Sequence, residues 1–173
     1  MITPFSIIPK AQNKLAKYVM TSCFCSCFIC VVVSMMLEKY KGLADIAALA
    51  FATAGIFFYN KYIYTTYAYE VVFDTDGTPV FVVRHTGRKS LATLCRIELS
   101  SIVDVKLLSK EERRDLPVDR TIPRYVYCPT MCPDAVYMIK MRSLSENADV
   151  FVELTDEAAS LLMQYARIAA GNL

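Results

Sequence analysis

Two long apolar stretches in the first third of the chain constrain its structure more than any other feature. Residues 18–37 run for 20 positions without a charged side chain, and residues 42–60 contain a single acid, Asp45, close to their start. A helix rises about 1.5 Å per residue, so such a stretch spans roughly 30 Å, the thickness of the hydrocarbon core of a bilayer. We therefore predict transmembrane helices over residues 18–37 and 42–60, with Asp45 at the membrane interface.

The connection between the two stretches is too short for anything but a tight turn. Only residues 38–41 separate them, so the helices should form an antiparallel hairpin within residues 18–64. Residues 1–17, an amphipathic tail, and residues 65–173 then lie on the same side of the membrane. A cleaved signal peptide is the alternative, but the first stretch is longer than a signal core and lacks a small-x-small cleavage site.

The lysines that flank the two stretches indicate which side that is. Four lie on the side of the tail and two lie in the turn, namely Lys10, Lys14, Lys17 and Lys61 against Lys39 and Lys41. Because basic residues favour the cytoplasmic side, we predict that both termini are cytoplasmic. The odd number of cysteines outside the spans (Cys95, Cys128 and Cys132) and the lack of an N-x-[ST] sequon agree with a reducing compartment.

The composition excludes some classes of function. The chain of 173 residues is 55% hydrophobic, which argues against a disordered protein, and its net charge is only +2. Residues 1–64 hold 6 lysines and 2 acids, whereas residues 65–173 hold 13 basic and 15 acidic residues. Neither part is basic enough to indicate a nucleic-acid binder.

After residue 64 the pattern changes to the alternation of apolar and polar residues that is typical of strands. Seven such segments follow, the first two joined by the turn signal Asp76-Gly77: residues 66–73, 79–85, 91–99, 101–108, 124–128, 135–143 and 148–154. We expect Leu94, Ile97 and Leu99 to face inward. Ser109 and Glu112 form a capping-box pattern, which predicts a helical turn over residues 109–116.

A helix is predicted to close the chain over residues 156–170. Thr155 is a suitable cap, Asp156 and Glu157 favour the first turn, and Gly171 follows the last one. Apolar residues recur at helical spacing, so one face should pack on the sheet: Leu161, Leu162, Tyr165 and Ile168. The 109 residues from 65 to 173 are enough for an independent core.

This order of elements resembles that of a known fold. A helical hairpin followed by four strands, a connection, three strands and a helix is similar to uncharacterised bacterial two-transmembrane-helix proteins with a pleckstrin-homology-like (PH-like) domain. The segments that carry the resemblance are GTPVFVVRHTGRKS, CRIELSSIVDV, YVYCPTMCPD and VFVELTDEAASLL. The resemblance implies an α+β domain, a seven-stranded antiparallel, partly open barrel capped by the helix. It also implies a bacterial inner-membrane protein with a cytoplasmic binding or scaffolding role.

Four basic residues are the candidate contact for the membrane surface or a partner. Arg84, Arg88, Lys89 and Arg96 gather around the loop between the second and third predicted strands. If this loop faces the bilayer, each charge near anionic headgroups contributes on the order of 1 kcal/mol. The alternative is a solvated loop or the rim of a protein interface. Asp74 and Asp76 in the first hairpin argue against the inositol-lipid recognition of PH domains.

The cysteines are the candidates for metal or thiol chemistry. Cys23, Cys27 and Cys30 fall on one face of the first predicted helix, where small thiols can equally serve close helix packing or acylation at the membrane edge. Cys128 and Cys132 form a C-x3-C pattern without the second ligand pair that is typical of zinc sites. We therefore predict no metal site and no cofactor.

No catalytic motif is found in the sequence. The segment around Arg88 and Lys89 lacks the first glycine of a Walker loop, and the single histidine, His85, has no evident nucleophile partner. We predict a non-catalytic, membrane-anchored binding or scaffold module that recognises a protein partner or the membrane surface. Its expected partners are the lipid bilayer and a protein, either another protein or further copies of this chain, but not nucleic acid. A membrane-embedded metal or thiol-redox protein is one alternative. The other is a subunit of an oligomeric transporter or channel, whose close-packing face would be Ala47, Ala48, Ala52 and Gly55.

Overall fold

The computed structural model describes residues 4–9, 13–86, 91–116, 121–142 and 147–171, which fall into two compact units. The first, which we call the helical hairpin, comprises residues 11–65 together with residues 130–132. The second, the α+β unit, comprises residues 1–10, 66–129 and 133–173. Helices and two β-sheets together give the chain the α+β class that the sequence predicts.

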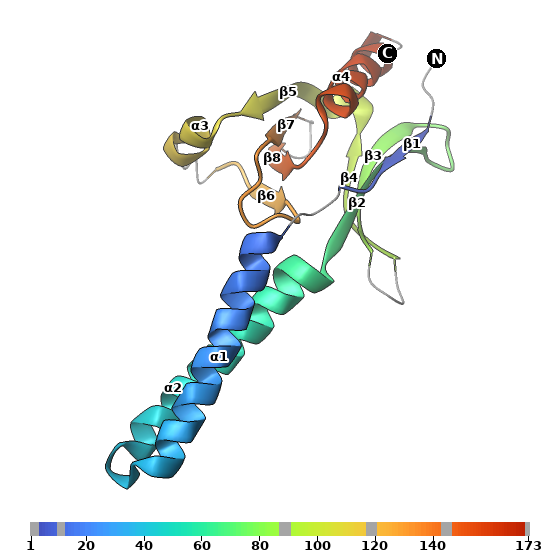
Figure 1. The fold of residues 1–173 in the computed structure, drawn as a ribbon. Coiled ribbons are helices and arrows are strands. Elements are labelled where there is room, and N and C mark those ends of the chain that lie inside the picture. The colour runs from blue at the N-terminus through green and yellow to red at the C-terminus, as the bar shows by residue number, and fades with distance from the viewer. Residues whose placement is uncertain (1–3, 10–12, 87–90, 117–120, 143–146, 172–173) are drawn as a thin grey trace. The chain divides into compact units, whose positions relative to one another are not determined.

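Two antiparallel helices make up the helical hairpin (Figure 1). Helix α1 spans Lys14–Met36 and α2 spans Lys41–Phe58, with a 3-10 turn, η1, at Glu38–Tyr40 between them and a π-helical turn, η2, at Tyr59–Tyr64. Helix α1 begins four residues before the predicted apolar stretch, because lysine is a good helix former. By length and composition, α1 and the continuous helix Glu38–Tyr64 are each able to cross a membrane.

Small side chains form the contact between α1 and α2. The buried helical residues are Ala16 and Ser34 on α1, and Ala44, Ala48 and Gly55 on α2. A Cβ atom on Gly55 would lie 3.1–3.3 Å from three ring carbons of Phe24, which is closer than ordinary van der Waals contact. The absence of a side chain on Gly55 therefore lets the Phe24 ring lie against the backbone of α2.

A buried asparagine joins both ends of the hairpin to a third segment. Asn13 lies just before α1, is 6% exposed, and donates from Nδ2 to the carbonyl oxygen of Tyr62 at 2.5 Å. Its Oδ1 accepts a hydrogen bond from the amide of Met131 at 3.1 Å. Both ends of the side-chain amide are thus used, as a buried amide requires.

The first sheet of the α+β unit has the order β1-β2-β3-β4 and is antiparallel throughout. Its strands are β1 (Phe5–Ile7), β2 (Thr66–Phe73), β3 (Pro79–Thr86) and β4 (Leu91–Glu98). The predicted turn between β2 and β3 is present, with Gly77 at a φ of 81°, a conformation that favours glycine. Leu94 proves to be 44% exposed, whereas Ile97 and Leu99 are buried as expected.

Strand β1 is an eighth strand that the sequence analysis missed. It lies within the segment predicted as an amphipathic tail, and Ser6 pairs with Glu70 of β2. Phe5 and Ile7 pack against the core, and the Phe5 and Tyr165 ring centroids are 6.2 Å apart. Three residues are too few for an alternating pattern to stand out, so the count of seven strands was wrong for that reason.

The second sheet has the order β5-β7-β8-β6, which differs from a simple meander. Its strands are β5 (Ile102–Leu108), β6 (Arg124–Tyr127), β7 (Val136–Arg142) and β8 (Asn147–Val152). Strand β6 pairs parallel to β8, so the expected all-antiparallel barrel is wrong, and the two sheets do not join into a closed barrel. Pro129 and Pro133 separate β6 from β7, and proline disfavours the direct hairpin that a meander needs.

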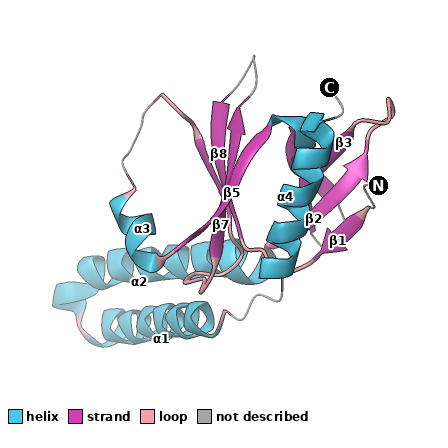
Figure 2. Cartoon of the chain, turned by 90° about the horizontal axis from the view of Figure 1, so that it is seen from above, coloured by secondary structure: helices cyan, strands magenta, loops and turns pink. Residues whose placement is uncertain are grey.

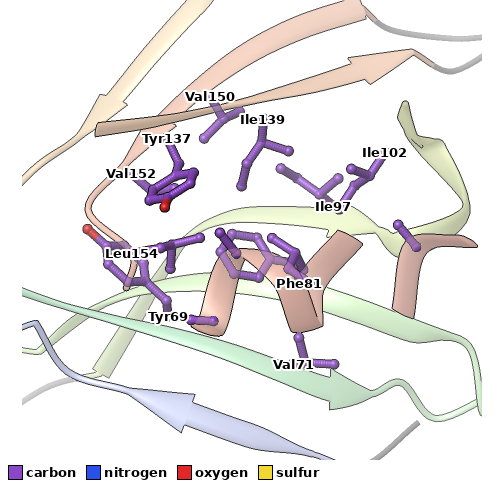
Figure 3. Packing of buried hydrophobic residues seen from close by; sticks show 14 of the residues in the cluster. Tyr69, Val71, Phe81, Ile97, Ile102, Tyr137, Ile139, Val150, Val152 and Leu154 are labelled. Atoms are coloured by element: carbon purple, nitrogen blue, oxygen red, sulfur yellow. The ribbon is translucent and has the colours of Figure 1, made fainter. Parts of the chain in front are cut away.

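The main core lies between the two sheets and helix α4 (Asp156–Gly171), as Figure 2 shows from above. Figure 3 shows how buried side chains of the two sheets meet, including Tyr69, Phe81, Ile97, Ile139 and Val150. From α4 the buried residues are Ala158, Ala159, Leu162, Tyr165 and Ala166. Leu161 was expected on this face but is 39% exposed, because the buried stripe is centred on Leu162.

The other face of the second sheet carries a smaller core and a row of charges. Leu108, Val136, Met138 and Phe151 form the smaller core. Near it, helix α3 (Lys110–Asp115) begins at the predicted capping box, in which Ser109 and Glu112 bond each other's backbone amides. The row crosses the sheet in the order β5-β7-β8-β6, one paired residue on each strand, and acids alternate with bases along it: Asp104, Lys140, Asp149 and Arg124. Opposite charges on neighbouring strands favour this register.

Candidate functional site

Aromatic side chains gather along one line of the α+β unit where strands of the two sheets approach each other. We call this set the aromatic seam and define it as Tyr67 of β2, His85 of β3, and Tyr125 and Tyr127 of β6. The ring centroids of His85 and Tyr67 are 6.4 Å apart, and those of Tyr67 and Tyr127 are 6.0 Å apart, both edge to face. The rings of Tyr125 and Tyr127 stack at 6.4 Å.

The seam is built by hydrogen bonds as well as by rings. The hydroxyl of Tyr127 donates to the carbonyl of Leu94 at 3.4 Å, which links β6 to β4. Beneath it, the buried Tyr69 donates to the carbonyl of Tyr127 at 2.6 Å and accepts from the amide of Glu153 at 3.3 Å. Burial raises the pKa of Tyr69, so this residue stays neutral and serves to hold the sheets together.

The exposed part of the seam is apolar with polar tips. Tyr125 is 40% exposed. Burial raises the pKa of Tyr127 to about 12, so its hydroxyl stays protonated at neutral pH. Tyrosine-rich surfaces of this kind are suited to binding, since a rigid ring provides contact area and a hydroxyl provides a hydrogen bond.

The basic residues chosen from the sequence lie beside acids rather than free in solvent. The Arg84 Nε is 3.3 Å from a carboxylate oxygen of Glu70, and Arg96 forms an ion pair with Asp74. Arg88 and Lys89 lie outside the described residues. Asp74 was noted in the sequence as an acid of the first hairpin but not as the partner of Arg96. Glu70 was not foreseen beside Arg84, although the hairpin at Asp76-Gly77 fixes the register of β2 and β3 and so brings the two residues near each other.

The cysteine candidates do not assemble into one site. Cys23, Cys27 and Cys30 are half-buried along α1, and all seven cysteines are free thiols. Cys128 is half-buried, its sulfur 3.8 Å from the carbonyl oxygen of Phe151, and burial raises its thiol pKa to about 12. Cys132 is exposed. In the part of the chain that the structure describes, no group of three His, Cys, Asp or Glu residues is placed to hold a metal ion.

A shallow cleft of about 490 Å³ lies between α4 and the second sheet. Its apolar side includes Val105, Met163 and Ile168, and its polar side includes Asp156 and Arg167. The hydroxyl of Tyr137 donates a hydrogen bond to the Asp156 carboxylate at one end of the cleft. This pairing ties the first residue of α4 to β7, so Asp156 acts in the structure of the cleft rather than as a free acid.

Part of the small-residue face predicted to join neighbouring hairpins is used inside the hairpin itself. Ala48 and Gly55 are buried between α1 and α2, with the Phe24 ring against Gly55. The observation that favoured an oligomeric channel or transporter therefore has a local explanation.

Comparison with protein-family models, with curated proteins and with solved structures finds no match to this chain.

Proposed function

We propose that this protein is a membrane-anchored, non-catalytic binding module. In this proposal the helical hairpin lies in the bilayer, and the α+β unit recognises a protein partner through the aromatic seam. The observation that carries the proposal is the apolar exterior of the hairpin. Many large apolar side chains of the hairpin point outward with most of their surface exposed. The exposed fractions are 71% for Phe28, 81% for Met35, 72% for Leu43, 70% for Ile46 and 69% for Leu49.

A bilayer is the environment that makes such an exterior favourable. Each exposed apolar side chain of this size would gain about 1.5–3 kcal/mol by leaving water, and the two helices expose many of them. Contiguous apolar patches of this extent are rare on soluble monomers. Small buried residues between the helices are also what helices use to associate in lipid, where large side chains gain nothing by turning inward.

The position of β1 supports a common side for both ends of the hairpin. Strand β1 precedes α1, β2 follows α2, and the two strands are neighbours in one sheet. A chain that crosses the membrane twice returns to the side from which it started. The lysine count of four to two favours the cytoplasmic face of a bacterial inner membrane for that side.

Two features favour a protein partner over an anionic membrane surface. Arg84 and Arg96 have acidic neighbours, which weakens their attraction for phosphate headgroups. The aromatic seam has the residue types that are enriched at protein interfaces. The relation to PH-like domains is part of the proposal, and the four-stranded first sheet with its hairpins and the single closing helix support it.

The proposal can be tested by crosslinking in native membranes followed by co-purification of the intact protein. The seam variants are Tyr125→Ala and His85→Ala, which each remove one ring of the seam. Leu161→Ala is the matched control, since Leu161 is a partly exposed residue of α4 outside the seam. We expect a specific crosslinked partner to be lost with both seam variants and kept with the control. Extraction of the protein by alkaline carbonate would refute the anchor.

The same variants separate the protein partner from the membrane surface. If binding at the seam is to lipid, the seam variants should weaken binding to vesicles of phosphatidylglycerol and phosphatidylethanolamine and leave the pattern of crosslinked proteins unchanged. That outcome would replace the protein partner with the membrane surface. A crosslinking pattern and vesicle binding that are both insensitive to the seam would reject the seam as a binding site.

A further inference from the structure

Strand β5 forms one edge of the second sheet, and its surface is unusual for an edge. In the order β5-β7-β8-β6 it has β7 on one side, and among the described residues no strand pairs with its other side. Figure 1 shows β5 at the margin of its sheet, between α3 and α4. Two of its apolar residues are exposed, Val103 at 59% and Leu107 at 47%. An edge of this kind is a template for another strand.

The sequence of this edge is complementary to itself. Residues 103–107 read Val-Asp-Val-Lys-Leu, with an acid and a base placed symmetrically about Val105. Two antiparallel copies related by a two-fold axis at Val105 would set Asp104 of each copy opposite Lys106 of the other. The same arrangement sets Val103 opposite Leu107 twice. Opposite charges and apolar pairs directly across two strands both stabilise an antiparallel ladder.

Neighbouring registers of the same pairing are unfavourable. A shift of the axis to Asp104 would set two acids opposite each other, and a shift to Lys106 would set two bases opposite each other. Charged residues on an edge strand ordinarily hinder pairing, as does the register shift of β5 between Ile102 and Asp104. Here the signs of the charges allow one register and oppose its neighbours, which is how an interface gains specificity.

The contacts that Asp104 and Lys106 already make leave room for a second partner. Lys106 lies 2.7 Å from Glu112, in an ion pair whose side chains are half-exposed, at 51% and 44%. Ion pairs in such exposed positions are weak, so the ammonium group can be shared with a carboxylate on another copy. Asp104 lies across from Lys140 of β7. On the other side of β5, no strand pairs with it among the described residues.

We propose that β5 is the interface of a homodimer, in which two copies of this chain pair their β5 strands antiparallel about Val105. The pairing joins two four-stranded sheets into one. It places a second strand beside the cleft between β5 and α4, where Met163 and Ile168 offer an apolar surface. The interface is isologous, because the same residues serve both copies. This inference goes beyond the proposed function, and the surface that it uses is separate from the aromatic seam.

The test exchanges charges across the two-fold axis. Full-length copies with two different affinity tags are co-expressed, purified in mild detergent, and assayed for the second tag after capture on the first. Asp104→Lys alone brings two pairs of bases together, and Lys106→Asp alone brings two pairs of acids together. We expect each variant paired with itself to lose about tenfold in recovery of the second tag. A mixture of the two variants restores opposite charges and should recover association.

The recovery in the mixture also answers the question of folding, since a misfolded variant would not regain a partner. Lys110→Asp is the matched control, because it makes the same change of charge at an exposed residue of α3 outside β5 and should associate as the parent does. Association that survives both single variants, or a mixture that fails to associate, would overturn the proposal. The seam variants should leave this association unchanged, so failure here and failure of the proposed function are distinguishable.

Discussion

In the helical hairpin the buried helical positions hold small residues such as Ala16, Ser34 and Ala48. The buried positions of the α+β unit hold larger residues, among them Tyr69, Phe81 and Leu162. The large apolar side chains of the hairpin, such as Phe28 and Leu49, lie on its outside. The α+β unit instead has charged side chains at its surface, such as the half-exposed pair of Lys106 and Glu112. The two units therefore distribute apolar surface in opposite ways.

The proposed membrane anchor accounts for this contrast, because the two units would then meet different solvents. In water, burial of large apolar side chains is the main favourable term of folding, and small residues are poor core formers. In lipid, helices gain by close backbone approach and by buried polar contacts, because the solvent is already apolar. Under the proposed anchoring one chain follows both rules, and substitutions of the same type should have opposite consequences in its two units.

The largest effect is expected for a core aromatic residue of the α+β unit. Phe81 of β3 is fully buried between the sheets, and Phe81→Ala should destabilise this unit by about 3–5 kcal/mol through lost burial and a residual cavity. Chemical denaturation followed by near-ultraviolet circular dichroism measures the loss. The matched change in the hairpin is Phe28→Ala at a 71% exposed site, which should leave the same transition unchanged. A cost for Phe28→Ala equal to that of Phe81→Ala would break the comparison.

A large side chain at Gly55 should be costly in the hairpin for the opposite reason. Its Cβ would lie 3.1 Å from the Phe24 ring, so Gly55→Leu must push the helices apart, at a cost of about 1–3 kcal/mol. Gly42 provides the control, because nothing lies within 4 Å of a Cβ at that position of α2. Unfolding in mixed micelles should show Gly55→Leu destabilised, Gly42→Leu near the parent, and partial recovery in the double variant Gly55→Leu/Phe24→Ala. Equal behaviour of the two glycine variants would mean that the close contact is not needed.

Much of the fold could be predicted because local patterns decide it. The apolar stretches, the Asp76-Gly77 turn, the capping box at Ser109 and the amphipathic closing helix all depend on residues within a few positions of each other. The missed strand β1 and the parallel pairing of β6 depend on distant partners, Glu70 and Asp149 among them. A periodic pattern within a short segment cannot predict a pairing between residues that are far apart in the chain.

The same distinction between short-range and long-range contacts explains why the candidate site was predicted only in part. Arg84 and Arg96 were chosen for their charge, but the acids beside them come from the neighbouring strand and turn. The aromatic seam joins Tyr67 and His85, which pair within the β2-β3 hairpin, to Tyr127 on β6, a strand of the other sheet much further along the chain. Alternation in the RYVY segment does place Tyr125 and Tyr127 on one face, and this was the one signal of the seam that the sequence carries.

A hydroxyl that bonds an aspartate occurs in both units, which allows a matched comparison of polar contacts. In the α+β unit Tyr137 donates to Asp156 at the start of α4, and Tyr137→Phe should cost about 1 kcal/mol at neutral pH. Burial, and then the bond to Asp156, raises the pKa of Tyr137 from 10.0 to about 12. The contribution is therefore complete below about pH 10 and is lost as the pH rises toward 12. Denaturation between pH 7 and 12 should show the two proteins converging, whereas a constant difference would assign the effect to packing.

The smallest effect is expected for the corresponding contact in the hairpin. Ser34 is 8% exposed on α1 and donates to a carboxylate oxygen of Asp45 on α2 at 2.5 Å. Polar contacts between helices in membranes average about 0.6 kcal/mol, since the separated helices also find partners, so Ser34→Ala should cost about that much in micelles. Thr53→Ala is the control, because the Thr53 hydroxyl bonds Leu49 of its own helix at 2.8 Å and joins nothing across the hairpin. If both variants unfold alike, Asp45 does not hold the helices together. Small side chains alone then account for the hairpin, and the contrast with the α+β unit becomes sharper.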